Sequence, residues 1–271
     1  LRRIVHFIGV TLENVLPRPL YRKIYTLYKA DLSGPRAGSI VSGLNADLLF
    51  CPFTAPYYYS PGIPTVIVVH DLQYQKYPQY FTSDELYNTD IQFKKSCQLA
   101  SRLICVSDHT RESVLQSSDI AVDRVKTIHT SFYNPLERIP EDAAEEILDQ
   151  YQLEKKNYLF YPANFWKHEL LITAFNIYVN QNPSSLIKLV MTGAPGERMD
   201  FLKDASQKMG IGDRIVFPGF VDEETLSVLF QNCLAMIFPS LYEGFGVPVL
   251  EAMSFEVPVL CSNLTSLPKV G

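Results

Sequence analysis

The feature that most constrains the fold of this chain is a regular alternation of short apolar runs with longer segments of helical periodicity, which begins near residue 45. Short apolar runs rich in β-branched side chains are typical of strands buried on both faces of a parallel sheet. The alternation therefore predicts an α/β fold with mostly parallel sheets. The predicted strands span residues 46–51, 64–70, 102–107, 125–128, 158–161, 187–193, 214–217, 234–238 and 257–261.

Helices are predicted between these strands, and two of them carry recognisable start signals. Thr82–Glu85 resembles a capping box ahead of a helix that runs to about Ala100, and Ser107 is placed to cap a helix through Leu115. Further helices are expected over residues 169–180, before Gly210, after Asp222 and through Glu251.

The alternation of strand and helix is interrupted over residues 141–150 and then resumes. This acidic stretch follows Pro135 and Pro140 and carries apolar residues at helical spacing, so we predict a surface connector helix there. A single core rarely grows beyond about 250–300 residues, so a chain of 271 residues favours two domains. We predict two doubly wound domains, over residues 1–140 and 150–271.

Composition excludes several classes of protein. The formal net charge of −5 provides no general attraction to phosphate backbones, so we expect no nucleic-acid partner. The five cysteines form no CxxC pair, which indicates small buried hydrophobes in a reducing compartment rather than a disulfide framework or a zinc site. No apolar stretch approaches the ~20 residues of a membrane span, and Leu1–Ile4 lacks the h-region of a signal peptide. These features predict a cytoplasmic protein.

One segment near the start of the chain suggests a membrane surface. Arg18, Arg22, Lys23 and Lys29 alternate with leucine, isoleucine and tyrosine side chains, which predicts a basic amphipathic helix. Such a helix fits peripheral contact with an anionic membrane, and it fits a packed surface helix equally well. Both interpretations stay open.

The strongest candidate site follows the apolar run that ends at Phe238. Glu243 and Glu251 stand eight positions apart and flank a Gly-Phe-Gly-Val-Pro turn. Gly244 and Gly246 allow backbone angles that other residues avoid, and Pro248 suits the first position of a helix. The helix N-terminus would then bind an anion such as a diphosphate, and the two carboxylates could accept hydrogen bonds from sugar and ribose hydroxyls.

This pattern resembles the retaining GT-B glycosyltransferases of family 4, the glycosyl transferases group 1. The full string from Pro239 to Met253 is similar to that of mannosyltransferase-type members. The resemblance covers roughly residues 46–271 and implies two Rossmann-like domains that face a cleft. Supporting similarity is found at Val69–Tyr74 with Tyr77–Pro78, at Val106–Asp108, and at Tyr161–His168, which is similar to the phosphate-binding loop of the family.

The resemblance also implies roles for individual residues. Glu251 would bind the nucleotide ribose, Glu243 the hydroxyls of the transferred sugar, and His70 would face that sugar from across the cleft. The donor phosphates would be held by the backbone of Phe245, Gly246 and Val247 together with Asn164 and Lys167. Retention would follow from a same-face attack in which the departing phosphate oxygen helps to deprotonate the acceptor. We therefore expect no protein nucleophile, no metal and no cofactor, since the nucleotide sugar is a substrate.

The chain departs from the family pattern in two places. The phosphate loop is about three residues short, because the helix predicted at Glu169 follows directly after Lys167 and His168. The pattern is also incomplete at both ends, where the Gly-rich loop of the first strand and the final helical segment are not found. Two interpretations stay open: Lys167 serves in place of the usual lysine of the loop, or the loop residues are missing from this sequence.

Together these features predict transfer of a hexose, mannose from GDP-mannose as the first choice, to a polysaccharide or lipid-linked glycan acceptor. The shortened phosphate loop motivates an alternative, a catalytically silent relative that binds a glycan or a partner enzyme. A nicotinamide-dependent oxidoreductase would require Gly-x-Gly-x-x-Gly after a strand, and the sequence contains no such fingerprint.

Overall fold

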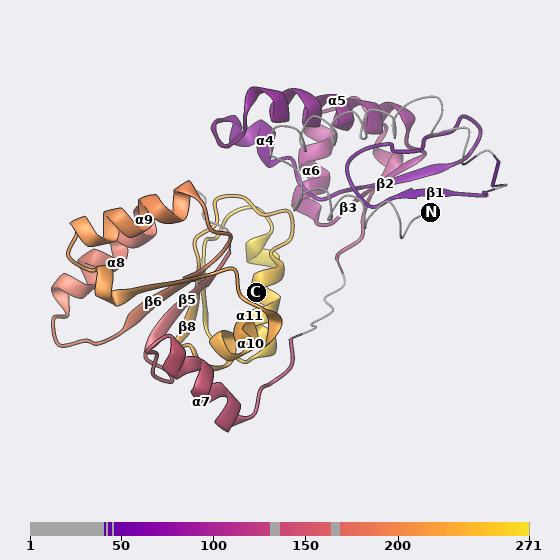
Figure 1. Cartoon of the computed structure of the whole chain (residues 1–271). Helices are drawn as coiled ribbons and strands as arrows, with labels where there is room; N and C mark the ends of the chain where they lie inside the picture. Colours follow the sequence, from indigo (N-terminus) through magenta and orange to yellow (C-terminus); the bar gives the residue numbers. More distant parts are fainter. Residues whose placement is uncertain (1–40, 42, 45, 131–135, 164–168, 271) are drawn as a thin grey trace, which may run out of the picture. The chain divides into compact units, whose positions relative to one another are not determined.

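The chain divides into two compact units, which meet in the sequence at Ile128 and His129. The computed structural model describes residues 41, 43–44, 46–130, 136–163 and 169–270 (Figure 1). Each unit has its own parallel sheet and its own core. The basic segment over residues 18–29 lies outside the described residues.

The sheet of the N-terminal unit has four parallel strands in the order β1-β2-β3-β4, and its helices follow β2 and β3. The sheet places the buried side chains of alternate strand positions, such as Ile67 and Val69, against one core cluster. The elements are β1 (Leu49–Cys51), β2 (Thr65–Val69), α4 (Gln73–Lys76), η1 (Pro78–Tyr80), α5 (Ser83–Leu99), β3 (Arg102–Cys105), α6 (Asp108–Gln116), η2 (Val122–Arg124) and β4 (Val125–Thr127).

Both predicted helix starts in this unit are present. The Thr82 hydroxyl accepts from the backbone N–H of Glu85, and the Glu85 carboxylate accepts from the backbone N–H of Thr82 at 2.8 Å, which completes the capping box. Ser107 accepts from the backbone N–H of Thr110 at 3.1 Å and caps α6. Local sequence therefore determines where α5 and α6 begin.

The sheet of the C-terminal unit has five parallel strands in the order β7-β6-β5-β8-β9. The chain first builds outward from β5 and then crosses to the other side at β8, so the strand order reverses between β5 and β8. The elements are α7 (Glu141–Gln150), β5 (Tyr158–Pro162), α8 (Glu169–Gln181), β6 (Lys188–Thr192), α9 (Glu197–Lys208), η3 (Gly212–Arg214), β7 (Ile215–Gly219), α10 (Glu223–Asn232), β8 (Ala235–Phe238), α11 (Val247–Ser254), β9 (Val259–Cys261) and η4 (Leu267–Lys269).

Helices cover both faces of this sheet (Figure 1). Along β5, Phe160 packs with α7, α10 and α11 in one core, whereas Tyr161 packs with α8 and α9 in another. In β6, Val190 belongs to the first core and Met191 to the second. This alternation explains why the strands read as continuous apolar runs, and the predicted α/β fold with parallel sheets is confirmed.

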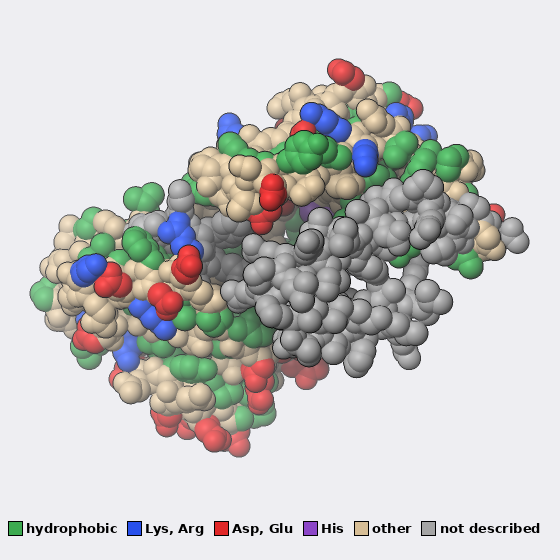
Figure 2. Space-filling view, turned by 45° about the horizontal axis from the view of Figure 1, so that its top comes forward, with side chains coloured by type: hydrophobic (Ala, Val, Ile, Leu, Met, Phe, Trp, Pro, Cys, Tyr) green, Lys and Arg blue, Asp and Glu red, His purple; other side chains and the backbone are tan. Residues whose placement is uncertain are grey.

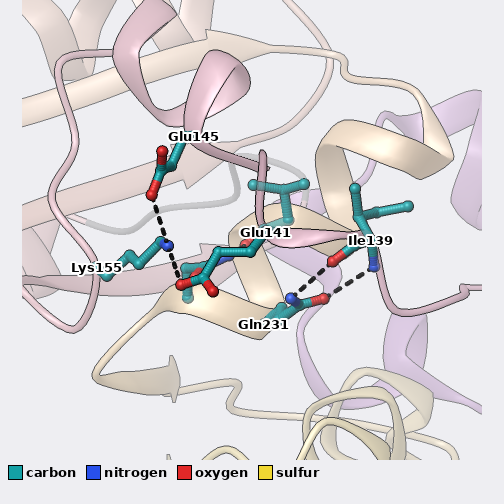
Figure 3. Close-up of polar contacts among 7 residues, drawn as sticks. Ile139, Glu141, Glu145, Lys155 and Gln231 are labelled. Atoms are coloured by element: carbon teal, nitrogen blue, oxygen red, sulfur yellow. Dashed lines mark hydrogen bonds and ion pairs between the residues drawn. The ribbon is translucent and has the colours of Figure 1, made fainter. Parts of the chain in front are cut away.

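The predicted connector helix, α7, packs into the core of the C-terminal unit. Ala144 and Leu148 are buried there, together with Leu136 from the preceding segment. The Gln231 side chain of α10 accepts from the backbone N–H of Ile139 and donates to its carbonyl, both at 3.0 Å (Figure 3). Residues from Leu136 onward are therefore part of the C-terminal unit, although the predicted N-terminal domain extended to residue 140.

The outer face of α7 is acidic. Lys155 forms ion pairs with Glu141 at 2.6 Å and Glu145 at 3.2 Å (Figure 3). Figure 2 shows acidic side chains gathered along the lower edge of the C-terminal unit, where α7 lies in Figure 1. The exposed acidic residues of the helix are Glu141, Asp142, Glu145, Glu146 and Asp149.

Two further details of the sequence analysis are corrected by the structure. Strand β1 begins at Leu49 rather than at residue 46, because only residues from Leu49 onward pair with β2. Cys51, Cys105 and Cys233 are buried as expected, whereas Cys97 is half-buried and Cys261 is exposed. Cys261 ends β9, which among the described strands is the edge strand of this sheet, next to β8.

Candidate functional site

The Glu243 loop, residues 239–246, lies at the point where the strand order of the C-terminal sheet reverses. It leaves the carboxyl end of β8 and leads directly into α11. In open α/β sheets, ligands bind outside the carboxyl ends of the strands at such a reversal. Glu243 belongs to this loop and Glu251 to α11, so both predicted carboxylates lie on the loop and helix that follow β8.

Gly246 is the position in this loop that requires glycine. It is the N-cap of α11 and has φ of 102°, in the left-handed region. A Cβ atom at this residue would lie 2.6 Å from Cδ2 of Leu267. Gly244 was expected to share this freedom, but its φ is not positive. The turn therefore depends on Gly246 for two reasons, backbone angle and space.

The N-terminus of α11 differs from the other helix N-termini that the structure describes. Side chains cap α5, α6 and α10, and the first turns of α7 and α9 contain acidic residues. Among the described α-helices of eight or more residues whose N-cap is also described, α11 alone has neither a side-chain cap nor an acid in its first turn. Neither a capping side chain nor an acid of its own first turn therefore offsets the positive dipole end of α11, which suits an anionic ligand.

Glu243 is half-buried and held at its side chain by a neighbouring hydroxyl. Ser240 Oγ donates to Glu243 Oε1 at 2.6 Å. Burial raises the pKa of the Tyr161 hydroxyl at the end of β5, and the negative charge of Glu243 raises it further. The negative charge of Glu243 thus acts on a side chain at the carboxyl end of β5, the other strand at the reversal point.

Glu251 lies in the second turn of α11 and is also half-buried. Burial raises the pKa of its carboxyl group above the ordinary value, because the ionised form loses hydration. A ligand that donates hydrogen bonds to the ionised carboxylate would compensate for this loss. A ribose diol supplies two such donors.

A second loop, Ser262–Leu267, supports the Glu243 loop from the neighbouring strand β9. Thr265 Oγ1 accepts from the backbone N–H of Glu243 at 3.0 Å, and Ser262 Oγ donates to the carbonyl of Ser240. Ser266 Oγ lies 2.9 Å from the carbonyl oxygens of both Glu243 and Phe245. Sequence analysis did not identify these residues, although they follow a predicted strand end and so obey the same rule that located Glu243.

His70 lies in the N-terminal unit, directly after β2, and its side chain is exposed. Its Nε2 atom is 2.7 Å from the carbonyl oxygen of Pro52, which can only accept, so Nε2 carries the proton. The Thr110 hydroxyl donates to the His70 carbonyl at 3.2 Å. Nδ1 is the ring atom left as an acceptor in this tautomer, and the predicted role of His70 stays a prediction.

The remaining predicted phosphate contacts, Asn164 and Lys167, lie outside the described residues. Within the part of the chain that the structure describes, no group of three or more His, Cys, Asp or Glu side chains is arranged to hold a metal ion. No helix among those same residues is both long enough and apolar enough to span a membrane.

Two family models match this chain, one for each unit. Residues 6–132 match Glycosyltransferase Family 4, and residues 143–270 match Glycosyl transferases group 1. O-antigen chain mannosyltransferase B of Escherichia coli is 30% identical over 209 residues, which are 76% of this chain and 54% of the relative. O-antigen chain mannosyltransferase RfbU of Salmonella typhimurium is 24% identical over 199 residues, 73% of this chain and 52% of the relative.

Solved structures share the fold at low sequence identity. Anabaena Alr3699/HepE in complex with UDP-glucose is 18% identical, with a TM-score of 0.69, and the match covers 89% of this chain and 66% of that one. A glycosyltransferase from Rickettsia africae ESF-5 is 15% identical, with a TM-score of 0.62, and the match covers 84% and 61%.

The chain spans about half the length of these two curated mannosyltransferases. The two family models together account for both units, and the site residues of the second unit lie within the group 1 match. The parallel sheets and the solved structures agree on the fold. The chain therefore belongs to the family 4 (glycosyl transferases group 1) glycosyltransferases of the GT-B fold, and its sequence is mannosyltransferase-like.

Proposed function

We propose that this protein is a retaining hexosyltransferase that moves a mannosyl unit from a nucleotide sugar, GDP-mannose as the first choice, to a polysaccharide or lipid-linked glycan. The observation that carries the proposal is the succession of Glu243, Gly246, the uncapped N-terminus of α11 and Glu251 at the reversal point of one sheet. The choice of mannose rests on the similarity to O-antigen mannosyltransferases.

The proposed chemistry needs binding and charge stabilisation rather than a protein nucleophile. The donor diphosphate binds at the N-terminus of α11, where backbone N–H groups and the helix dipole stabilise the negative charge that grows as the sugar departs. Glu251 accepts hydrogen bonds from the ribose, and Glu243 from the sugar hydroxyls. The acceptor oxygen attacks the anomeric carbon as the bond to phosphate breaks, and the departing phosphate oxygen takes the acceptor proton.

The test is a transfer assay with the full-length protein and a panel of nucleotide sugars. We expect one donor, GDP-mannose first, to be consumed, with the product linkage retained at the anomeric carbon by NMR. Activity should persist in excess EDTA, because the proposed site stabilises the diphosphate without a metal. Inverted product, or activity abolished by EDTA and restored by a divalent cation, would contradict the corresponding part of the proposal.

Variants identify the residues responsible. Glu243→Ala and Glu251→Ala should each reduce kcat/KM by about 10- to 150-fold, since a charged hydrogen bond of about 1.5–3 kcal/mol is lost at each position. His70→Ala tests the predicted role of the imidazole in the same assay. Glu146→Ala, an exposed carboxylate on α7, is the matched control and should behave as wild type.

Calorimetry with GDP, UDP and ADP separates this proposal from the silent relative suggested by the shortened phosphate loop. An active donor site should bind one of the three in the wild-type protein and lose that affinity in Glu251→Ala. A protein that binds none of them and consumes no nucleotide sugar would favour the glycan-binding or partner-binding alternative.

A further inference from the structure

The Glu243 residue is held by three different hydroxyl groups, two of which come from the loop after β9. Ser240 Oγ donates to its carboxylate at 2.6 Å, Thr265 Oγ1 accepts from its backbone N–H at 3.0 Å, and Ser266 Oγ lies 2.9 Å from its carbonyl oxygen. The carboxylate, the backbone N–H and the carbonyl of Glu243 are thus each in contact with a hydroxyl group.

Thr265 makes its contact from an unfavourable backbone conformation. Its φ is 56°, in the left-handed region, which is a rare position for a β-branched residue. Such backbone strain persists only where surrounding structure maintains it, and it is concentrated at functional sites. Here the conformation turns the Thr265 hydroxyl toward the Glu243 N–H.

Ser266, the next residue, is almost fully buried, at 2% exposure. Its hydroxyl lies 2.9 Å from the carbonyl of Glu243 and 2.9 Å from that of Phe245, so it ties both ends of a three-residue segment to one point. A hydroxyl has a single proton to donate, so the two carbonyls share it. Ser266 therefore holds the backbone of residues 243–245, which lead to Gly246, whereas Thr265 contacts the backbone N–H of Glu243.

We infer that Thr265 and Ser266 are positioning residues for the transfer reaction, and that Thr265 sets the position of Glu243 against the transferred sugar. The inference rests on the proposed function, in which Glu243 contacts that sugar. Because catalytic groups misplaced by about 1 Å can lose about 100-fold in rate, a hydroxyl that fixes the backbone of Glu243 affects turnover without touching the donor.

The experiment compares three substitutions of Thr265 in the full-length protein. Thr265→Val keeps the β-branch and the volume but removes the acceptor, and we expect kcat to fall at least about tenfold. Thr265→Ser keeps the acceptor and should restore kcat to within about threefold of wild type. The Kd for the matching nucleoside diphosphate, which lacks the sugar, should change by less than about twofold in both variants.

Thr265→Gly distinguishes a positioning role of the hydroxyl from a role in stability alone. Glycine adopts positive φ without strain but supplies no hydroxyl. We expect its thermal unfolding midpoint to stay at or above that of Thr265→Val, while its kcat falls as far. A structural role would make activity follow stability across the three variants, and that correlation would overturn the inference.

Ser266→Ala distinguishes the two hydroxyls. Because Ser266 also holds the Phe245 carbonyl next to Gly246, we expect this variant to raise the Kd for the nucleoside diphosphate several-fold as well as to lower kcat. Wild-type kcat in Thr265→Val would overturn the inference and leave the proposed function intact. A wild-type protein that transfers sugar from no nucleotide sugar would overturn both.

Discussion

Gly246→Ala is the substitution whose effect follows most directly from the geometry of the site. The new Cβ would lie 2.6 Å from Cδ2 of Leu267, a side chain that is 1% exposed, so the leucine methyl can move only by displacing its neighbours. The φ of 102° adds a second, independent penalty for any residue with a side chain. The variant therefore tests backbone strain and overpacking at one position.

The expected loss of stability is the sum of these two contributions. A left-handed conformation costs a non-glycine residue about 1–2 kcal/mol, and overpacking a buried site costs about 1–3 kcal/mol. We expect the free energy of unfolding of the C-terminal unit to fall by about 2–5 kcal/mol in Gly246→Ala. Donor affinity should fall too, since the same backbone carries the predicted phosphate contacts.

Gly210→Ala is the matched control within the same unit. Gly210 also has a positive φ, of 72°, but a Cβ atom there would meet nothing within 4 Å. This variant should lose only the strain contribution of about 1–2 kcal/mol. Denaturant titrations can follow the fluorescence of Trp166, the single tryptophan of the chain, whose position in the sequence belongs to the C-terminal unit.

A double-mutant cycle with Leu267→Ala isolates the contact. Leu267→Ala alone should cost about 2–5 kcal/mol because it leaves a cavity, but in the Gly246→Ala background part of that space receives the new methyl group. We expect the double variant to be more stable than the sum of the single effects by about 1–3 kcal/mol. Equal losses in Gly246→Ala and Gly210→Ala, with additive behaviour in the cycle, would refute the reasoning.

Burial raises the pKa of Glu251, so the folded state binds its proton more tightly than the unfolded state and stability falls as pH rises from the unfolded-state pKa of about 4.3 to the raised folded-state pKa. Glu251→Gln should remove this fall, and an identical pH profile of unfolding in wild type and variant would contradict the assignment. Gln231→Ala should lower the free energy of unfolding by about 1–3 kcal/mol, because it leaves two backbone groups of Ile139 without their partner. Lys155→Ala breaks only surface ion pairs and should lower it by less. The reverse order in chemical denaturation would show that α7 is held mainly by its charges. Ser107→Ala should destabilise the N-terminal unit by about 1 kcal/mol through loss of the α6 cap, and an unchanged thermal midpoint would count against that role.

Much of the fold could be predicted because its signals are local. Apolar runs such as Thr65–Val69 form strands since both faces of a parallel sheet are covered, and the capping box of Thr82 and Glu85 acts within four residues. The sequence also placed Glu243 and Glu251 on a loop and the following helix, because Gly246 and Pro248 determine where α11 begins. These features depend on neighbours in the chain.

What the tertiary structure decided depends on residues far apart in the sequence. Only the pairing of β8 with β9 brings Thr265 and Ser266 to the Glu243 loop, and only packing places Leu267 beneath Gly246. The attachment of α7 to α10 through Gln231 likewise joins segments 92 residues apart. Sequence periodicity reports which face of an element is apolar, but hydrogen bonds between loops depend on the strand order that brings those loops together.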